Sequence, residues 1–196
     1  MFRHLLALTL AAVPLFAGSL TPADRETLVA DFQRTSDAFA ASLAGLSAEQ
    51  WNYKAAPDRW SIAECAEHIA ESEGFIRSFI EKAVFAGNAK ASPEAKKDDA
   101  IRKFIVDRGQ KFQAPEPLKP TRKFATPADA LAAFKSSRAR NVELIRTRDD
   151  LRDLSGQHPA FKEVDAYGWF LFLSGHTARH TAQIEEVKAS PGYPKR

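Results

Sequence analysis

Apolar side chains recur at steps of three and four residues in four stretches of this chain, at 22–43, 61–85, 126–151 and 168–187. That spacing places them on one face of an α-helix, so each stretch is predicted to form an amphipathic helix. The third stretch has the weakest apolar stripe. No credible run of alternating apolar and polar residues indicates strands, and no glycine-rich phosphate loop is present. The pattern therefore predicts an all-α fold, a four-helix bundle.

Each predicted helix begins at a residue that can accept hydrogen bonds from the backbone N–H groups of the first turn. These residues are Thr21, Ser61, Thr126 and Asp165. Pro22 and Pro127 suit the first helical position, where a missing N–H costs nothing. Glu64 completes the S-x-x-E pattern of a capping box. The starts of the four helices are thus better defined by the sequence than their ends.

Two connections between the predicted helices have unusual compositions. Three large aromatic residues, Trp51, Tyr53 and Trp60, fall within ten positions and are expected to pack at one end of the bundle. The segment 87–126 contains four prolines and a charged run, with helical spacing only around 99–108. We interpret it as an insertion that crosses from the second helix to the third and covers one end of the bundle.

The first nineteen residues resemble a secretory signal peptide. A short basic start precedes a mostly apolar run from Leu5 to Ala17, and small residues follow at 17–19. A short membrane anchor or an ordinary helix is the alternative interpretation. The run is too short for a permanent membrane span. A lipid anchor is not expected, because no cysteine lies near residues 17–19. We expect export to the periplasm or outside the cell, and a mature helical domain at 20–190.

Composition narrows the function without defining it. The chain has 196 residues, of which 44% are hydrophobic and 27% charged, as expected for one globular domain. The formal net charge is only +3, and the one basic cluster, 119–123, lies in a proline-rich loop, so nucleic-acid binding is not predicted. Cys65 is the only cysteine, so no internal disulfide can form.

Three histidines are the candidate metal ligands. His176 and His180 are four residues apart on the last predicted helix, so their side chains lie one above the other. His68 lies beside the inward stripe of the second helix and can face the same interior. Three protein ligands with one vacant position are typical of catalytic zinc, although imidazole also suits nickel, copper and iron. Packed histidines without a metal are the alternative.

Other residues near these histidines are weaker candidates. Cys65 is a fourth ligand or, more simply, a small buried side chain. His158 precedes a proline in a predicted loop, where it is less suited to be a ligand. Glu64 and Gln183 are candidate hydrogen-bond partners of ligand histidines, although Glu64 is also needed for the capping box. Arg179 points about 100° away from His180 and is expected to pair with an acid on a neighbouring helix.

Two short motifs resemble the DinB-like (DinB/YfiT) family. The run from Trp60 to Glu64, followed by His68, is similar to the family's W-S-x-x-E-x-x-x-H, and 176–183 is similar to its H-x-x-R-H-x-x-Q. The resemblance covers roughly 21–189. It implies an up-down-down-up bundle and a divalent metal, nickel or zinc, held by the three histidines. Several members of the family attach low-molecular-weight thiols to electrophiles or isomerise with them, others are labelled metal-dependent hydrolases, and homodimers are common.

These observations lead to one hypothesis and two rivals. The hypothesis is an exported metal-dependent enzyme that acts on a small molecule, of hydrolase or thiol-transferase type. The first rival is a non-catalytic module of the stress response that binds a metal, a small ligand or a partner. The second is a structural domain whose histidines are merely packed. No separate general base is evident in the sequence, and whether the protein is catalytic stays open.

Overall fold

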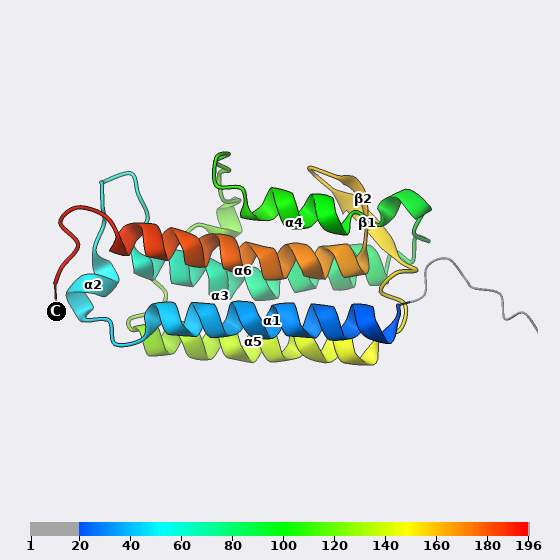
Figure 1. Ribbon diagram of the computed structural model, residues 1–196, viewed down its shortest axis with the longest axis horizontal. Helices are drawn as coiled ribbons and strands as arrows, with labels where there is room; N and C mark the ends of the chain where they lie inside the picture. The colour runs from blue at the N-terminus through cyan, green and yellow to red at the C-terminus, as the bar shows by residue number, and fades with distance from the viewer. Residues whose placement is uncertain (1–19, 196) are drawn as a thin grey trace, which may run out of the picture.

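The computed structural model describes residues 20–195, and the predicted signal segment 1–19 lies outside that range. Four long helices, α1 (Pro22–Leu43), α3 (Ile62–Phe79), α5 (Pro127–Thr147) and α6 (Ala166–Lys188), form one bundle (Figure 1). α1 and α6 run in one direction along the bundle, and α3 and α5 run in the other. The helices thus follow the up-down-down-up order that the family resemblance implies, and the all-α prediction is confirmed for these elements.

The predicted caps are present. Thr21, Ser61 and Thr126 form capping boxes with Asp24, Glu64 and Asp129, and Asp165 Oδ1 accepts a hydrogen bond of 2.6 Å from the backbone N–H of Gly168. Most of the predicted ends agree as well. The second helix ends at Phe85 as predicted, although its last turn is the π-helical η1 (Ile80–Phe85). The third helix differs, because α5 ends at Thr147, before the predicted end at residue 151.

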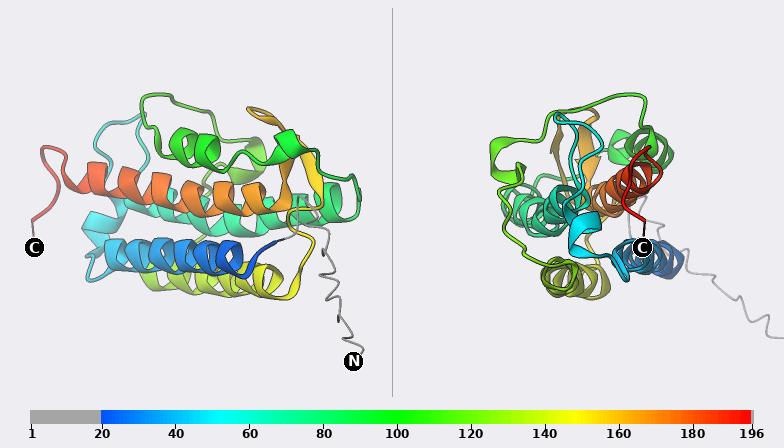
Figure 2. Two further views of the ribbon diagram at one scale, coloured as in Figure 1. Left: turned by 45° about the vertical axis from the view of Figure 1, so that its right-hand side comes forward. Right: turned by 90° about the vertical axis from the view of Figure 1, so that its left-hand side faces the viewer.

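The apolar faces of the four helices meet in a core around which each helix contacts two others. α1 packs on α5 and α6, and α3 packs on the same two helices (Figure 2). Phe32 meets Phe170 edge-on at 6.2 Å between ring centroids, and Phe39 meets Phe134 at 4.7 Å. All four rings are fully buried, so these contacts hold α1 against α6 and α5.

The centre of the bundle also contains a buried ion pair. Glu73 of α3 accepts a hydrogen bond of 2.6 Å from Arg138 of α5, and both side chains are buried. Thr177 of α6 and Asn141 of α5 donate to the two oxygens of the same carboxylate, at 3.1 and 2.8 Å. The Arg138 guanidinium stacks on the ring of Phe32 at 4.4 Å. Four side chains from three helices are thereby locked together.

The inserted segment lies along the side of the bundle rather than over one end. It contains η2 (Pro93–Ala95), α4 (Asp98–Val106) and η3 (Glu116–Leu118), and α4 packs along α6 (Figure 1). Gly175 allows this close approach, because a Cβ atom there would clash with the side chain of Ile105. From α4 the chain crosses to η3, which contacts α3. The insertion therefore joins the two helices that carry the histidines.

The prediction that the chain has no strands is wrong. Two four-residue strands, β1 (Ser155–His158) and β2 (Lys162–Asp165), form an antiparallel hairpin immediately before α6. Lys162, which opens β2, has φ of 62°, a left-handed conformation uncommon for a residue other than glycine. Strands this short, with few apolar residues, show no alternation that sequence reasoning could use.

A short helix and three aromatic side chains occupy one end of the bundle. α2 (Ala48–Asn52) is capped by Ser47, and Trp51 is fully buried against the core, as expected. Tyr53 is half-buried and its ring meets that of Tyr193 at 5.5 Å. Trp60 is also half-buried and lies against two of the histidines. Within residues 20–195, no helix combines the length and the apolar content that crossing a membrane requires.

Candidate metal centre

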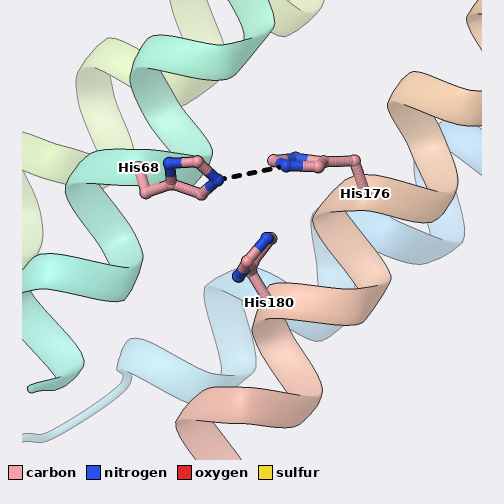
Figure 3. Close-up of side chains that lie close together, drawn as sticks. All are labelled: His68, His176 and His180. Carbon is pink, nitrogen blue, oxygen red and sulfur yellow. Dashed lines mark hydrogen bonds between the residues drawn. The ribbon is translucent and has the colours of Figure 1, made fainter. Parts of the chain in front are cut away.

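The structure brings His68, His176 and His180 together between α3 and α6 (Figure 3). One ring nitrogen from each lies within 4.8 Å of the others, and Nε2 of His68 lies 3.1 Å from Nε2 of His176. Two nitrogens that bind one metal at about 2.0–2.1 Å in tetrahedral geometry are roughly 3.3 Å apart. The pair from different helices is thus already close to that separation, and the group could hold a metal ion.

Hydrogen bonds fix the orientation of two of the three rings. His68 Nδ1 donates to the backbone carbonyl of Leu118 at 2.9 Å, because a carbonyl can only accept. His180 Nδ1 donates to Gln183 Oε1 at 2.9 Å. Each bond places the ring proton on Nδ1 and leaves a lone pair on Nε2, the arrangement of a metal-binding imidazole.

His176 differs from the other two histidines. Since His68 Nε2 carries a lone pair, the bond of 3.1 Å between the two rings requires His176 Nε2 to donate its proton. His176 Nδ1 is buried and has no hydrogen-bond partner among the described residues. A metal ion bound between the rings would take the place of the proton on His176 Nε2, so this nitrogen would still have a partner.

All three rings favour the neutral form. Burial lowers the pKa of His68 below the usual value near 6.5. Burial, together with the neighbouring His68, lowers the pKa of His180 to about 3. Burial and the other two histidines lower the pKa of His176 well below its usual value. Neutral imidazoles have the lone pairs that metal ions require, so protons compete weakly for this site at neutral pH.

The other residues singled out in the sequence have structural contacts. Cys65 is fully buried in the apolar core, outside the histidine group, and burial raises the pKa of its thiol to about 12. His158, in β1, packs against Trp169 and Phe172 at 4.7 Å between ring centroids. Burial lowers the pKa of His158 to about 4, and it is also outside the group.

The two candidate partners of the histidines, Glu64 and Gln183, and the neighbouring Arg179 have different outcomes. Glu64 accepts hydrogen bonds from the Ser61 backbone and from Lys54, so the capping role excludes contact with a histidine. Gln183 is bonded to His180, as the sequence suggested. The expectation for Arg179 is wrong, because its guanidinium donates to the backbone carbonyls of Ile105, Asp107 and Gln110 rather than to an acid. These bonds attach the end of α4 to α6.

Sequence reasoning missed two parts of the site. The Leu118 carbonyl comes from the insertion, fifty residues after His68, and a backbone oxygen leaves no trace in residue identity. Trp60, expected to pack at one end of the bundle, lies against His68 at 4.9 Å and His180 at 6.1 Å between ring centroids. The available signal was its position directly before the N-cap Ser61, at the start of the helix that carries His68.

Taken together, these features define an all-α protein with a candidate metal centre of three histidines from two helices. Residues 31–184 match the model of the DinB superfamily, most of the bundle included. The chain belongs to the DinB superfamily.

Two Bacillus subtilis proteins are similar to this chain. The uncharacterized protein YuaE of strain 168 is 26% identical over 149 residues, which cover 74% of this chain and 88% of YuaE. The structure of YfiT, described as "a probable metal-dependent hydrolase with an unusual four-helix bundle topology", superposes with a TM-score of 0.58 at 15% identity. The match covers 90% of this chain and 92% of YfiT. At that identity, the likeness to YfiT establishes the shared fold.

Proposed function

We propose that His68, His176 and His180 hold one divalent metal ion, nickel or zinc, and that the protein is a metal-dependent enzyme of hydrolase or thiol-transferase type. The observation that carries this proposal is the pair of facing Nε2 atoms, 3.1 Å apart, on rings from different helices. The description of YfiT as a probable metal-dependent hydrolase supports the same class. A divalent ion at such a site polarises a bound water or thiol and lowers its pKa toward neutral.

The protein's own contribution is to prepare and shield the ligands. The Leu118 carbonyl and the Gln183 amide oxygen keep the ring protons of His68 and His180 on Nδ1. The half-buried Trp60 ring lies against one side of His68. Three neutral side chains would leave one position vacant in a tetrahedral ion, and a substrate group would bind there.

A non-catalytic metal-binding module is the second candidate. It is favoured by one observation: the group formed by the described residues contains three histidines and no carboxylate that could act as a general base. We also propose that the protein is exported, on the basis of the signal-like sequence at 1–19. N-terminal sequencing of the secreted or periplasmic protein, with a start near residue 20, would support export.

The metal site is tested by metal analysis of untagged protein refolded with Zn²⁺ or Ni²⁺. The wild type is expected to retain about one equivalent and His176→Ala less than about 0.2 equivalents. His158→Gln is the matched control, because it removes a buried histidine outside the group, and it should retain about one equivalent. A wild type and His176→Ala with equal metal content would refute the proposal.

Catalysis is tested separately with ester, amide and thiol-transfer substrates. The metal-loaded wild type should convert at least one class, and His176→Ala, folded by circular dichroism, should not. Equal rates for the two proteins would favour the binding module.

A further inference from the structure

Two half-buried aromatic rings stand at opposite ends of the histidine group. Phe172, His176 and His180 are four residues apart and form one row along α6. The Phe172 ring lies 6.3 Å from that of His176, at one end of this row. The Trp60 ring lies 6.1 Å from that of His180, at the other end. The metal ligands are thus bracketed by two apolar surfaces that solvent can reach.

A series of ring contacts leads from Phe172, through the buried ring of His158, to the outside of the protein. Successive rings lie 4.7 to 5.6 Å apart between centroids. The order is Phe172, His158, Phe161, Phe104 and Phe112. Phe112 is 60% exposed and is one of three large hydrophobic side chains that the described residues expose. A second of the three, Val106, ends α4 in the same inserted segment. The inserted segment that packs along α6 thus carries exposed apolar side chains, and ring contacts connect one of them to Phe172.

The charge of the proposed centre adds a second requirement. The three histidines are neutral ligands, so a divalent ion bound to them keeps its full charge. The charged residues nearest along α6 include Arg179, whose guanidinium contacts backbone carbonyls, and Glu186, which is already paired with Arg108 at 2.7 Å. No acidic side chain belongs to the group itself within the described chain. An anionic group would therefore bind the ion better than a neutral one.

We infer that the substrate of this site joins an anionic metal-binding group to an aromatic or planar apolar body, and that Trp60 and Phe172 hold that body. This inference rests on the proposed metal centre and specifies its substrate class. Aromatic rings favour planar partners through stacking and edge contacts, in addition to the apolar area they bury. An ordinary packing role for the two rings would give no such preference.

The test compares two probes that share one metal-binding group, benzohydroxamate and acetohydroxamate, by titration calorimetry on the zinc-loaded protein. Benzohydroxamate should bind at least about tenfold more tightly, because only it offers a ring to Trp60 and Phe172. Phe172→Leu or Trp60→Leu, whichever removes the ring that the probe contacts, should lower that ratio by about threefold or more. Zinc content and thermal unfolding are measured for every variant.

Phe85→Leu is the matched control, because Phe85 is also half-buried but its ring contacts the guanidinium of Arg148 at 3.8 Å. It should leave the ratio unchanged. Equal affinities for the two probes, or a ratio unaffected by both Trp60→Leu and Phe172→Leu, would overturn the substrate class and leave the metal centre standing. Failure of the wild type to bind zinc would overturn the metal centre and, with it, the inference.

Discussion

Two polar clusters lie side by side along α3 and α6, one built around a charged pair and the other from neutral rings. In the ion-pair cluster, both oxygens of Glu73 accept hydrogen bonds from Arg138, Asn141 and Thr177. In the histidine group, two Nε2 atoms face one another across the helix interface, and His176 Nδ1 has no partner among the described residues. The first cluster pairs its charges within the chain, although Arg138 Nε and Asn141 Oδ1 have no partner among the described residues. The second cluster contains no charge to pair, and its two facing Nε2 atoms could bind something that the chain does not supply.

The contrast predicts which of the two clusters stabilises the fold and which one binds the metal. A buried ion pair whose carboxylate accepts hydrogen bonds on both oxygens fixes how α3, α5 and α6 meet, and losing one partner strands a charge in the core. The histidine rings are neutral, since burial lowers their pKa values, so removing one strands no charge. We therefore expect substitutions in the first cluster to affect folding and substitutions in the second to affect metal binding.

The largest expected effect comes from Glu73→Ala. It leaves the Arg138 guanidinium buried without its carboxylate, so the free energy of unfolding should fall by about 3–5 kcal/mol. Urea unfolding of the metal-free protein measures this loss. Glu71→Ala, which removes a partly exposed acid paired with Lys123, should cost less than about 1 kcal/mol. A loss below about 1 kcal/mol for Glu73→Ala would show that the ion pair does not hold the bundle together.

A second expected effect concerns pH and His158, a buried histidine outside both clusters. Its pKa is about 4 in the folded protein and near 6.5 when unfolded, because burial disfavours its charged form. Between these values the unfolded chain binds the proton and the folded one does not, so stability is lost as the pH falls from 6.5 to 4. The loss from this residue is up to about 1.4 kcal/mol per pH unit.

His158→Gln removes this contribution, so its stability should fall less steeply with pH than that of the wild type. Urea unfolding of both metal-free proteins at several pH values between 7 and 4 measures the two slopes. The histidine group titrates in both proteins and cancels in the difference. Parallel curves would contradict the prediction.

The two clusters also differ in how far the sequence predicted them. His176 and His180 were found because helical spacing alone puts them on one face, and His68 because it lies beside an apolar stripe. The ion pair was missed, although both of its side chains are buried. The weak apolar stripe of the third helix gave no reason to bury Arg138. In the sequence of the second helix, Glu73 has the pattern of an ordinary polar residue. Periodicity predicts which apolar residues meet, but it cannot pair charges from different helices.

The same limit applies to the partners of the histidines. Gln183 could be proposed because it is three residues from His180 on one helix, whereas Leu118 reaches His68 only through the path of the insertion. The hairpin before α6 likewise could not be predicted from the sequence, since its strands have four residues each and few apolar side chains. Local geometry was predictable, and contacts that depend on a long connection were not.

The smallest expected effect separates the clusters most sharply, because it changes metal binding without changing the ligands. Gln183→Leu removes the acceptor of His180 Nδ1, so the ring proton is no longer held away from Nε2. Metal affinity should fall about 10- to 100-fold, as is usual when such a partner is lost. Competition with a chromophoric chelator measures the affinity.

Gln183→Glu is the matched control, because its carboxylate can accept the same hydrogen bond and should retain or strengthen metal binding. The unfolding free energy of the metal-free protein should change by less than about 0.5 kcal/mol in both variants, since Gln183 is only half-buried. If Gln183→Leu lowered stability and metal affinity together, the histidine group would have to be regarded as part of the core, like the ion pair. If it lowered metal affinity alone, the group would behave as a site whose structure the bundle supports but does not require.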